Sequence, residues 1–203
     1  MSRTAVIASL LVAAVAAAAA LFGGIAPAGA QGGGSVSGEV KVSGTPPPPK
    51  TIKINKDTQV CGNEKTLAAV EVGPGNGLAD AVVTVGGAKA PKPAKKAALD
   101  QKGCEFRPEV LVMAPGEVDI LNSDGVLHNI HTFSTANPPI NKAQPKFKKV
   151  MTEKFEKPEM IKVQCDAHSW MLGWIAVTEN PAATTDQKGS FKIDNVPPGK
   201  HKV

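Results

Sequence analysis

Apolar and polar residues alternate in short runs along most of the chain after residue 35, and clusters of Gly, Pro or Asn separate the runs. Residues 36–42 show the alternation of a strand with one buried face, and no long segment of this part has a helical period. The expected strands cover residues 36–42, 51–54, 68–72, 81–85, 110–113, 117–121, 128–133, 149–155, 159–163 and 173–177. This pattern predicts an all-β chain folded as a Greek-key antiparallel β-sandwich with a small β extension.

Two connections between the expected strands can be predicted from composition. Residues 114–116 (Ala-Pro-Gly) are typical of a tight turn, so the strands at 110–113 and 117–121 are expected to form a hairpin. Residues 86–103 are basic, rich in Pro, Ala and Gly, and lack any period. They predict a loop that is longer than most connections in a compact domain.

The first thirty residues have the pattern of a secretory signal peptide. A short positive start at Arg3 precedes an apolar run at 5–21, and the small residues 28–30 (Ala-Gly-Ala) form a cleavage pattern. An uncleaved membrane anchor is the alternative, but the weakly hydrophobic Ala-rich run and Pro27 favour cleavage. We therefore expect a periplasmic or otherwise exported protein. Association of this exported protein with a membrane is compatible with the same pattern.

Export changes the interpretation of the three cysteines, because an oxidising compartment pairs cysteines that can meet. Cys61 and Cys104 both lie in loop sequence beside a glycine, and we predict a disulfide between them. Cys165 is then the odd thiol. A bound metal would protect it, whereas the alternative is a buried and inert cysteine.

The charge balance excludes one class of partner. The chain has 23 Lys and Arg against 18 Asp and Glu, a formal net charge of +5, which is too small to indicate nucleic-acid binding. The lysines are concentrated at residues 89–102 and 146–157. Such runs are typical of solvated loops, and the functional alternative is a docking surface for an acidic redox partner.

The candidate chemistry is concentrated in residues 165–171. Cys165, His168 and Met171 follow one another at a spacing of three on one short loop, and His128 can supply a second imidazole from a neighbouring strand end. One thiolate, two imidazoles and one thioether are the donors that select copper, with the thioether as a weak axial ligand. His131 is a possible extra metal contact, but strand alternation turns it away from His128 and favours a solvated histidine.

Residues 117–177 resemble the cupredoxin family, the type 1 or blue copper proteins. The resemblance rests on residues 118–122 before the pair 128–129, and on the loop 165–171 followed by 173–177. That short loop is most similar to the loops of amicyanin and plastocyanin. The resemblance implies a cupredoxin-like sandwich that holds one copper ion, which alternates between Cu(I) and Cu(II).

The resemblance also implies roles for single residues. His128, Cys165 and His168 would be equatorial ligands and Met171 the axial one, while Asn129 would tie the two ligand segments together. Asp166 stands where many cupredoxins carry Ser or Thr, and its charge would favour Cu(II) and lower the reduction potential. Residues 168–171 also resemble the end of the binuclear copper motif of cytochrome oxidase subunit II. Ser169 occupies the position of its second cysteine, so we expect a mononuclear site.

The C-terminal residues 184–201 resemble the closing hairpin of carboxypeptidase regulatory-like domains, and residues 37–40 weakly match the opening strand of such domains. The predicted organisation is a signal peptide at 1–30, a cupredoxin-like domain at 31–180, and a partial regulatory-like β-hairpin at 181–203.

The leading interpretation is an exported mononuclear copper protein that carries single electrons and is not an enzyme. Four ligands leave no open position for a small-molecule substrate, and no acid, base or nucleophile constellation accompanies them. A cytochrome or a membrane redox complex is the expected partner, with the electron leaving through an exposed His168 imidazole. The alternatives are copper binding and delivery without electron transfer, and a structural or interaction subunit of a larger redox complex.

Overall fold

A computed structural model describes residues 33–203 of the chain. The predicted signal peptide at 1–30 lies outside the described residues. Within residues 33–203, none of the helices has the length and apolar character needed to span a bilayer.

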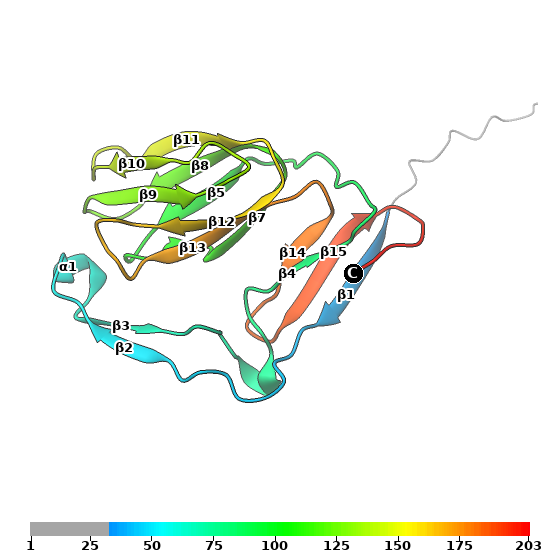
Figure 1. The fold of residues 1–203 in the computed structure, drawn as a ribbon, viewed down its shortest axis with the longest axis horizontal. Coiled ribbons are helices and arrows are strands. Elements are labelled where there is room, and N and C mark those ends of the chain that lie inside the picture. Colours follow the sequence, from blue (N-terminus) through cyan, green and yellow to red (C-terminus); the bar gives the residue numbers. More distant parts are fainter. Residues whose placement is uncertain (1–32) are drawn as a thin grey trace, which may run out of the picture. The chain divides into compact units, whose positions relative to one another are not determined.

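Two sheets form the larger part of the fold (Figure 1). The five-stranded sheet has the order β10-β9-β12-β13-β7, and the four-stranded sheet has the order β11-β8-β5-β6. The strands of the first sheet are β7 (Val110–Met113), β9 (His128–Phe133), β10 (Asn141–Gln144), β12 (Glu159–Gln164) and β13 (Leu172–Val177). Those of the second are β5 (Ala97–Gln101), β6 (Phe106–Arg107), β8 (Gly116–Asn122) and β11 (Val150–Phe155).

The core lies between these sheets and follows the alternation of the sequence. In β8, Val118 and Ile120 are buried, whereas the one residue between them is only partly buried. Ile161 and Val163 of β12 follow the same pattern. These side chains belong to one hydrophobic cluster, to which both sheets contribute. The prediction of an all-β sandwich is confirmed.

Strand pairing differs from the prediction in two respects. β13 pairs in parallel with β7, and β5 pairs in parallel with β8, so the sandwich is not antiparallel throughout. The hairpin expected from 110–121 is absent, because β7 and β8 belong to different sheets. A local turn signal shows where a strand ends, but it does not determine which distant strand pairs with it.

The predicted basic loop at 86–103 is not a loop throughout, since Ala97–Gln101 within it form β5. Leu99 is fully buried and lies opposite Ile120 in the parallel pair of β5 and β8. The sequence Ala-Ala-Leu-Asp-Gln has a low intrinsic β propensity, which is why the pattern missed this strand. The sheet imposes the extended conformation through pairing and through burial of Leu99.

Residues near the two ends of the described chain pair with each other, on the two sides of the domain boundary that the sequence predicted at residue 180. β1 (Gly34–Glu39) pairs with β15 (Ser190–Val196), and β4 (Val82–Thr84) pairs with β14 (Ala182–Thr184). A second hydrophobic cluster joins these segments, so residues 181–203 form no hairpin of their own. Val36 of β1 and Phe191 of β15 are partly buried against this cluster, so the pairing covers apolar side chains of both strands. The buried residues of this cluster are Val85, Ala88, Ile193 and Val196.

The remaining elements precede the sandwich in sequence. β2 (Lys50–Lys53) and β3 (Glu64–Leu67) form an antiparallel pair, and α1 (Thr58–Cys61) lies between them. A short 3₁₀ turn, η1, covers Pro74–Asn76. Residues 50–67 are called the β2–β3 segment below.

One carboxylate outside the candidate site should control the acid stability of the sandwich. Glu159, at the start of β12, accepts hydrogen bonds from backbone amides and side chains of residues 134–137, including the Thr135 amide at 2.6 Å. Partial burial alone would raise its pKa, but these hydrogen bonds outweigh it and hold the pKa of Glu159 well below the ordinary value of 4.5.

We therefore expect stability from this group to be complete above about pH 4.5 and to be lost progressively as the pH falls toward the lowered pKa. Glu159→Gln should flatten the dependence of the unfolding free energy on pH between pH 5 and about pH 2.5. Urea unfolding of both proteins across this range measures the effect. An identical pH profile for the two proteins would refute it.

Candidate metal centre

Three buried donor atoms from two separate segments meet at one point of the fold. The Nδ1 atoms of His128 and His168 are 3.1 Å apart, and Cys165 Sγ lies 3.9 Å from the first and 3.8 Å from the second. His128 begins β9, whereas Cys165 and His168 lie in the loop between β12 and β13. The relative exposures of the three residues are 0%, 1% and 0% in the order His128, Cys165, His168.

Backbone hydrogen bonds close the loop that carries two of these donors. The Cys165 amide donates to the Met171 carbonyl, the His168 amide to the Cys165 carbonyl, and the Met171 amide to the His168 carbonyl. These three hydrogen bonds hold the backbone of residues 165–171 in a closed turn. The Met171 side chain is also buried, at 1% exposure, at the end of the same loop.

Each imidazole has a carboxylate partner on the side away from the other imidazole. His128 Nε2 lies 2.8 Å from Asp124 Oδ2, and His168 Nε2 lies 2.9 Å from Asp57 Oδ2. If both Nε2 atoms carry the proton, two Nδ1 lone pairs face each other across 3.1 Å. Lone pairs at that distance repel unless a cation lies between them, either a proton or a metal ion.

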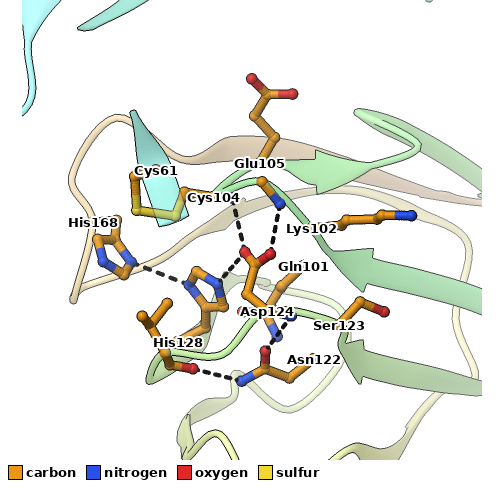
Figure 2. Close-up of polar contacts among 12 residues, drawn as sticks. Cys61, Gln101, Lys102, Cys104, Glu105, Asn122, Ser123, Asp124, His128 and His168 are labelled. Carbon is orange, nitrogen blue, oxygen red and sulfur yellow. Dashed lines mark hydrogen bonds and ion pairs between the residues drawn. A yellow bond between two sulfur atoms is a disulfide. The ribbon is translucent and has the colours of Figure 1, made fainter. Parts of the chain in front are cut away.

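The Asp124 carboxylate is itself firmly held (Figure 2). It is buried, and its oxygens accept the backbone N–H groups of Gly103 and Cys104, each at 2.8 Å. Burial opposes ionisation, but these amides and the bond to His128 outweigh it, so the pKa of Asp124 lies below its ordinary value. A carboxylate anion at this position balances positive charge on His128 or on a metal beside it.

The electrostatics of His128 and Cys165 favour their neutral forms when no metal is bound. Burial, together with the neighbouring His168, lowers the pKa of His128, although Asp124 opposes this. Burial also raises the pKa of the Cys165 thiol, although backbone amides, beginning with that of Asn129, oppose it. A metal ion that binds Cys165 must therefore displace its proton.

Asn129 connects the two segments that carry the donors. Its backbone amide donates to Cys165 Sγ at 3.3 Å, and its side-chain oxygen accepts the Asp166 amide at 3.1 Å. Its side-chain nitrogen donates to Asn141 of β10 at 2.7 Å. These bonds join β9 to the 165–171 loop and to β10.

His131 does not join the donor cluster. It lies on the other face of β9, is partly exposed, and its Nδ1 atom is 2.9 Å from Asp166 Oδ1. Asp166 is exposed as well and also accepts a hydrogen bond from Asn141 at 3.1 Å. His131 and Asp166 therefore form a pair at the surface, which joins β9 to the 165–171 loop.

The predicted disulfide between Cys61 and Cys104 is present. Its sulfur atoms lie within 4.8 Å of a ring nitrogen of His168, and Cys61 is the last residue of α1 (Figure 2). The β2–β3 segment thus lies against the candidate centre. The expectation of an exposed His168 is wrong, because Asp57 and the residues around it cover the imidazole edge that would otherwise face solvent.

Sequence reasoning missed both carboxylates. Asp124 lies in residues 122–125 (Asn-Ser-Asp-Gly), a sequence typical of a turn, although its position four residues before His128 is within reach of that side chain. Asp57 is 111 positions from His168, and no local pattern marks it.

The donors fit a soft first-row metal ion. Separations of 3 to 4 Å are those that three atoms span when one ion binds each of them at about 2.0 to 2.3 Å. One thiolate and two imidazoles, with a buried thioether on the same loop, form the donor set that suits copper.

Comparisons with known proteins give partial structural likenesses. A copper-containing nitrite reductase from Thermus scotoductus SA-01 is 26% identical with a TM-score of 0.38, and the match covers 46% of this chain but only 24% of the reductase. A purple cupredoxin from Nitrosopumilus maritimus is 22% identical over 41% of this chain and 100% of its own, with a TM-score of 0.35. A mutant of amicyanin in its Cu(I) form is 15% identical over 49% of this chain and 100% of its own, with a TM-score of 0.38. No family model and no curated protein matches the sequence.

Proposed function

We propose that this chain is an exported mononuclear type 1 copper protein that carries single electrons between redox partners. The observation that carries the proposal is the buried meeting of Cys165 Sγ with the Nδ1 atoms of His128 and His168. These three residues would hold the ion, and the buried Met171 of the same loop would offer a thioether as a further donor. Bound copper would supply one-electron exchange between Cu(I) and Cu(II).

The chain's own residues suit electron transfer better than copper delivery. The donors are held by the closed backbone of the 165–171 loop, by two carboxylates and by Asn129. Rigid donors change little between two oxidation states, which keeps reorganisation small. Delivery would require a site that opens to an acceptor, whereas all four proposed ligands are buried.

Export and the partner belong to the same proposal. The signal-peptide pattern of residues 1–30 supports export, and so does a disulfide, which persists in oxidising compartments. The partner would be a cytochrome or a membrane redox complex, and the lysines at 146–157 offer charge for an acidic docking surface.

Copper titration tests the proposal. Metal-free protein should bind one Cu(II) per chain and become intensely coloured through charge transfer from the Cys165 thiolate, and a mild reductant should bleach the colour reversibly. Cys165→Ser should abolish the colour completely. Ser169→Ala, an exposed position on the same loop, is the control and should keep it.

Three results would contradict the electron-carrier function. They are a colourless wild-type protein, a colour that survives Cys165→Ser, and rapid loss of copper to a chelator. The last of these would favour the delivery alternative.

A further inference from the structure

Asp57 uses its side chain in an unusual way. It occupies the N-cap position of α1, where Asp normally accepts a hydrogen bond from a backbone amide of the first helical turn. Here the side chain makes no such bond, and the residue adopts a left-handed conformation, with φ 50° and ψ 37°. Its carboxylate instead reaches His168 Nε2 at 2.9 Å, so helix capping is given up for a contact with the metal centre.

Two further connections hold Asp57 at this position. Lys56 Nζ donates to the carbonyl of Ala167, inside the loop that carries the ligands, at 3.0 Å. The disulfide fixes Cys61, four residues after Asp57, to Cys104. The β2–β3 segment is therefore attached to the centre on both sides of Asp57.

Asp124 has the corresponding place on the other imidazole. It contacts the same ring atom, Nε2, at nearly the same distance, 2.8 Å for His128 against 2.9 Å for His168. The amide of Cys104 donates to Asp124, and the sulfur of Cys104 is bonded to Cys61 of α1. One disulfide thus joins the chain segments that position the two carboxylates.

We propose that Asp57 and Asp124 are a pair of positioning residues that set the tautomer and the basicity of the two histidine ligands. Each carboxylate accepts a hydrogen bond from the Nε2–H group of its histidine. The proton therefore stays on Nε2, and Nδ1 is left unprotonated and directed at the metal. Two carboxylates acting through the imidazoles make both ligands more basic and so stabilise the more positive Cu(II) state. The inference rests on the proposed copper function. It adds the two carboxylates that would set the reduction potential of the site.

The first test measures the reduction potential. Asp57→Asn removes the charge and keeps a similar shape, and Asp57 is partly exposed without another side-chain partner, so the fold should persist. We expect the ratio of Cu(II) to Cu(I) affinity to fall about tenfold, which corresponds to a rise of about 59 mV in potential. Glu64→Gln, an exposed carboxylate of the same segment, is the matched control and should leave the potential unchanged. An unchanged potential in Asp57→Asn would overturn the proposal.

The second test needs no copper. In metal-free protein labelled with ¹⁵N, the imidazole of His168 should carry its proton on Nε2, with a strongly hydrogen-bonded proton resonance that Asp57→Ala removes and Glu64→Gln preserves. A wild-type His168 that is unprotonated at Nε2 would overturn the positioning role. Because this result is obtained without metal, it stands apart from a failure of the protein to bind copper, which would instead contradict the proposed function.

Discussion

Replacing Cys61 and Cys104 together by alanine is expected to lower the free energy of unfolding by about 4 kcal/mol. The bond joins residues 43 positions apart, and it stabilises the fold mainly by restricting the unfolded chain. Both cysteines are buried in the main hydrophobic cluster, so the double variant also loses packing. The effect is large because this single cross-link connects the β2–β3 segment to the sandwich beside the centre.

Urea unfolding of the metal-free proteins measures this loss. A thiol reductant should remove the loop-closure part of this stability from the wild type, which keeps both buried side chains, and should leave the variant itself unchanged. A loss below about 1 kcal/mol would contradict the loop-closure argument, since that is the size of an ordinary substitution. In the copper-loaded variant, Asp57 loses the disulfide and keeps only the Lys56 contact as a tether, and the potential should rise in the same direction as in Asp57→Asn.

Asp124→Ala is expected to destabilise the metal-free protein by about 3–5 kcal/mol. The substitution leaves two backbone amides, those of Gly103 and Cys104, and His128 Nε2 without an acceptor. All three groups lie next to a residue that is only 7% exposed, so water does not readily replace the carboxylate. A buried charge whose partners are all polar and fixed is costly to remove.

The control is Asp194→Ala, an exposed carboxylate of β15 that pairs with Lys192. An exposed pair of this kind contributes little, so this variant should change stability by less than about 1 kcal/mol. Thermal unfolding by circular dichroism compares the two variants with the wild type. Equal stability of the two variants would show that Asp124 is not held as described.

The local pattern of the sequence was sufficient for the features that depend on neighbours in the chain. Alternating apolar residues predicted β8 and β12, because one buried face requires that period. The spacing of Cys165, His168 and Met171 placed these residues on one loop, since all three lie in the short connection between the strands expected at 159–163 and 173–177. The pairing of Cys61 with Cys104 was predicted from their positions in loop sequence beside a glycine, and the bond is present.

The tertiary structure alone decided which distant segments meet. Residues Ala97–Gln101 form a strand only because β8 pairs with them and buries Leu99, and β15 pairs with β1 although most of the chain separates them. Likewise, His168 is buried rather than exposed because Asp57, 111 positions away, reaches it through the β2–β3 segment. Such contacts depend on the packing of the whole chain, so the sequence pattern around any single residue does not predict them.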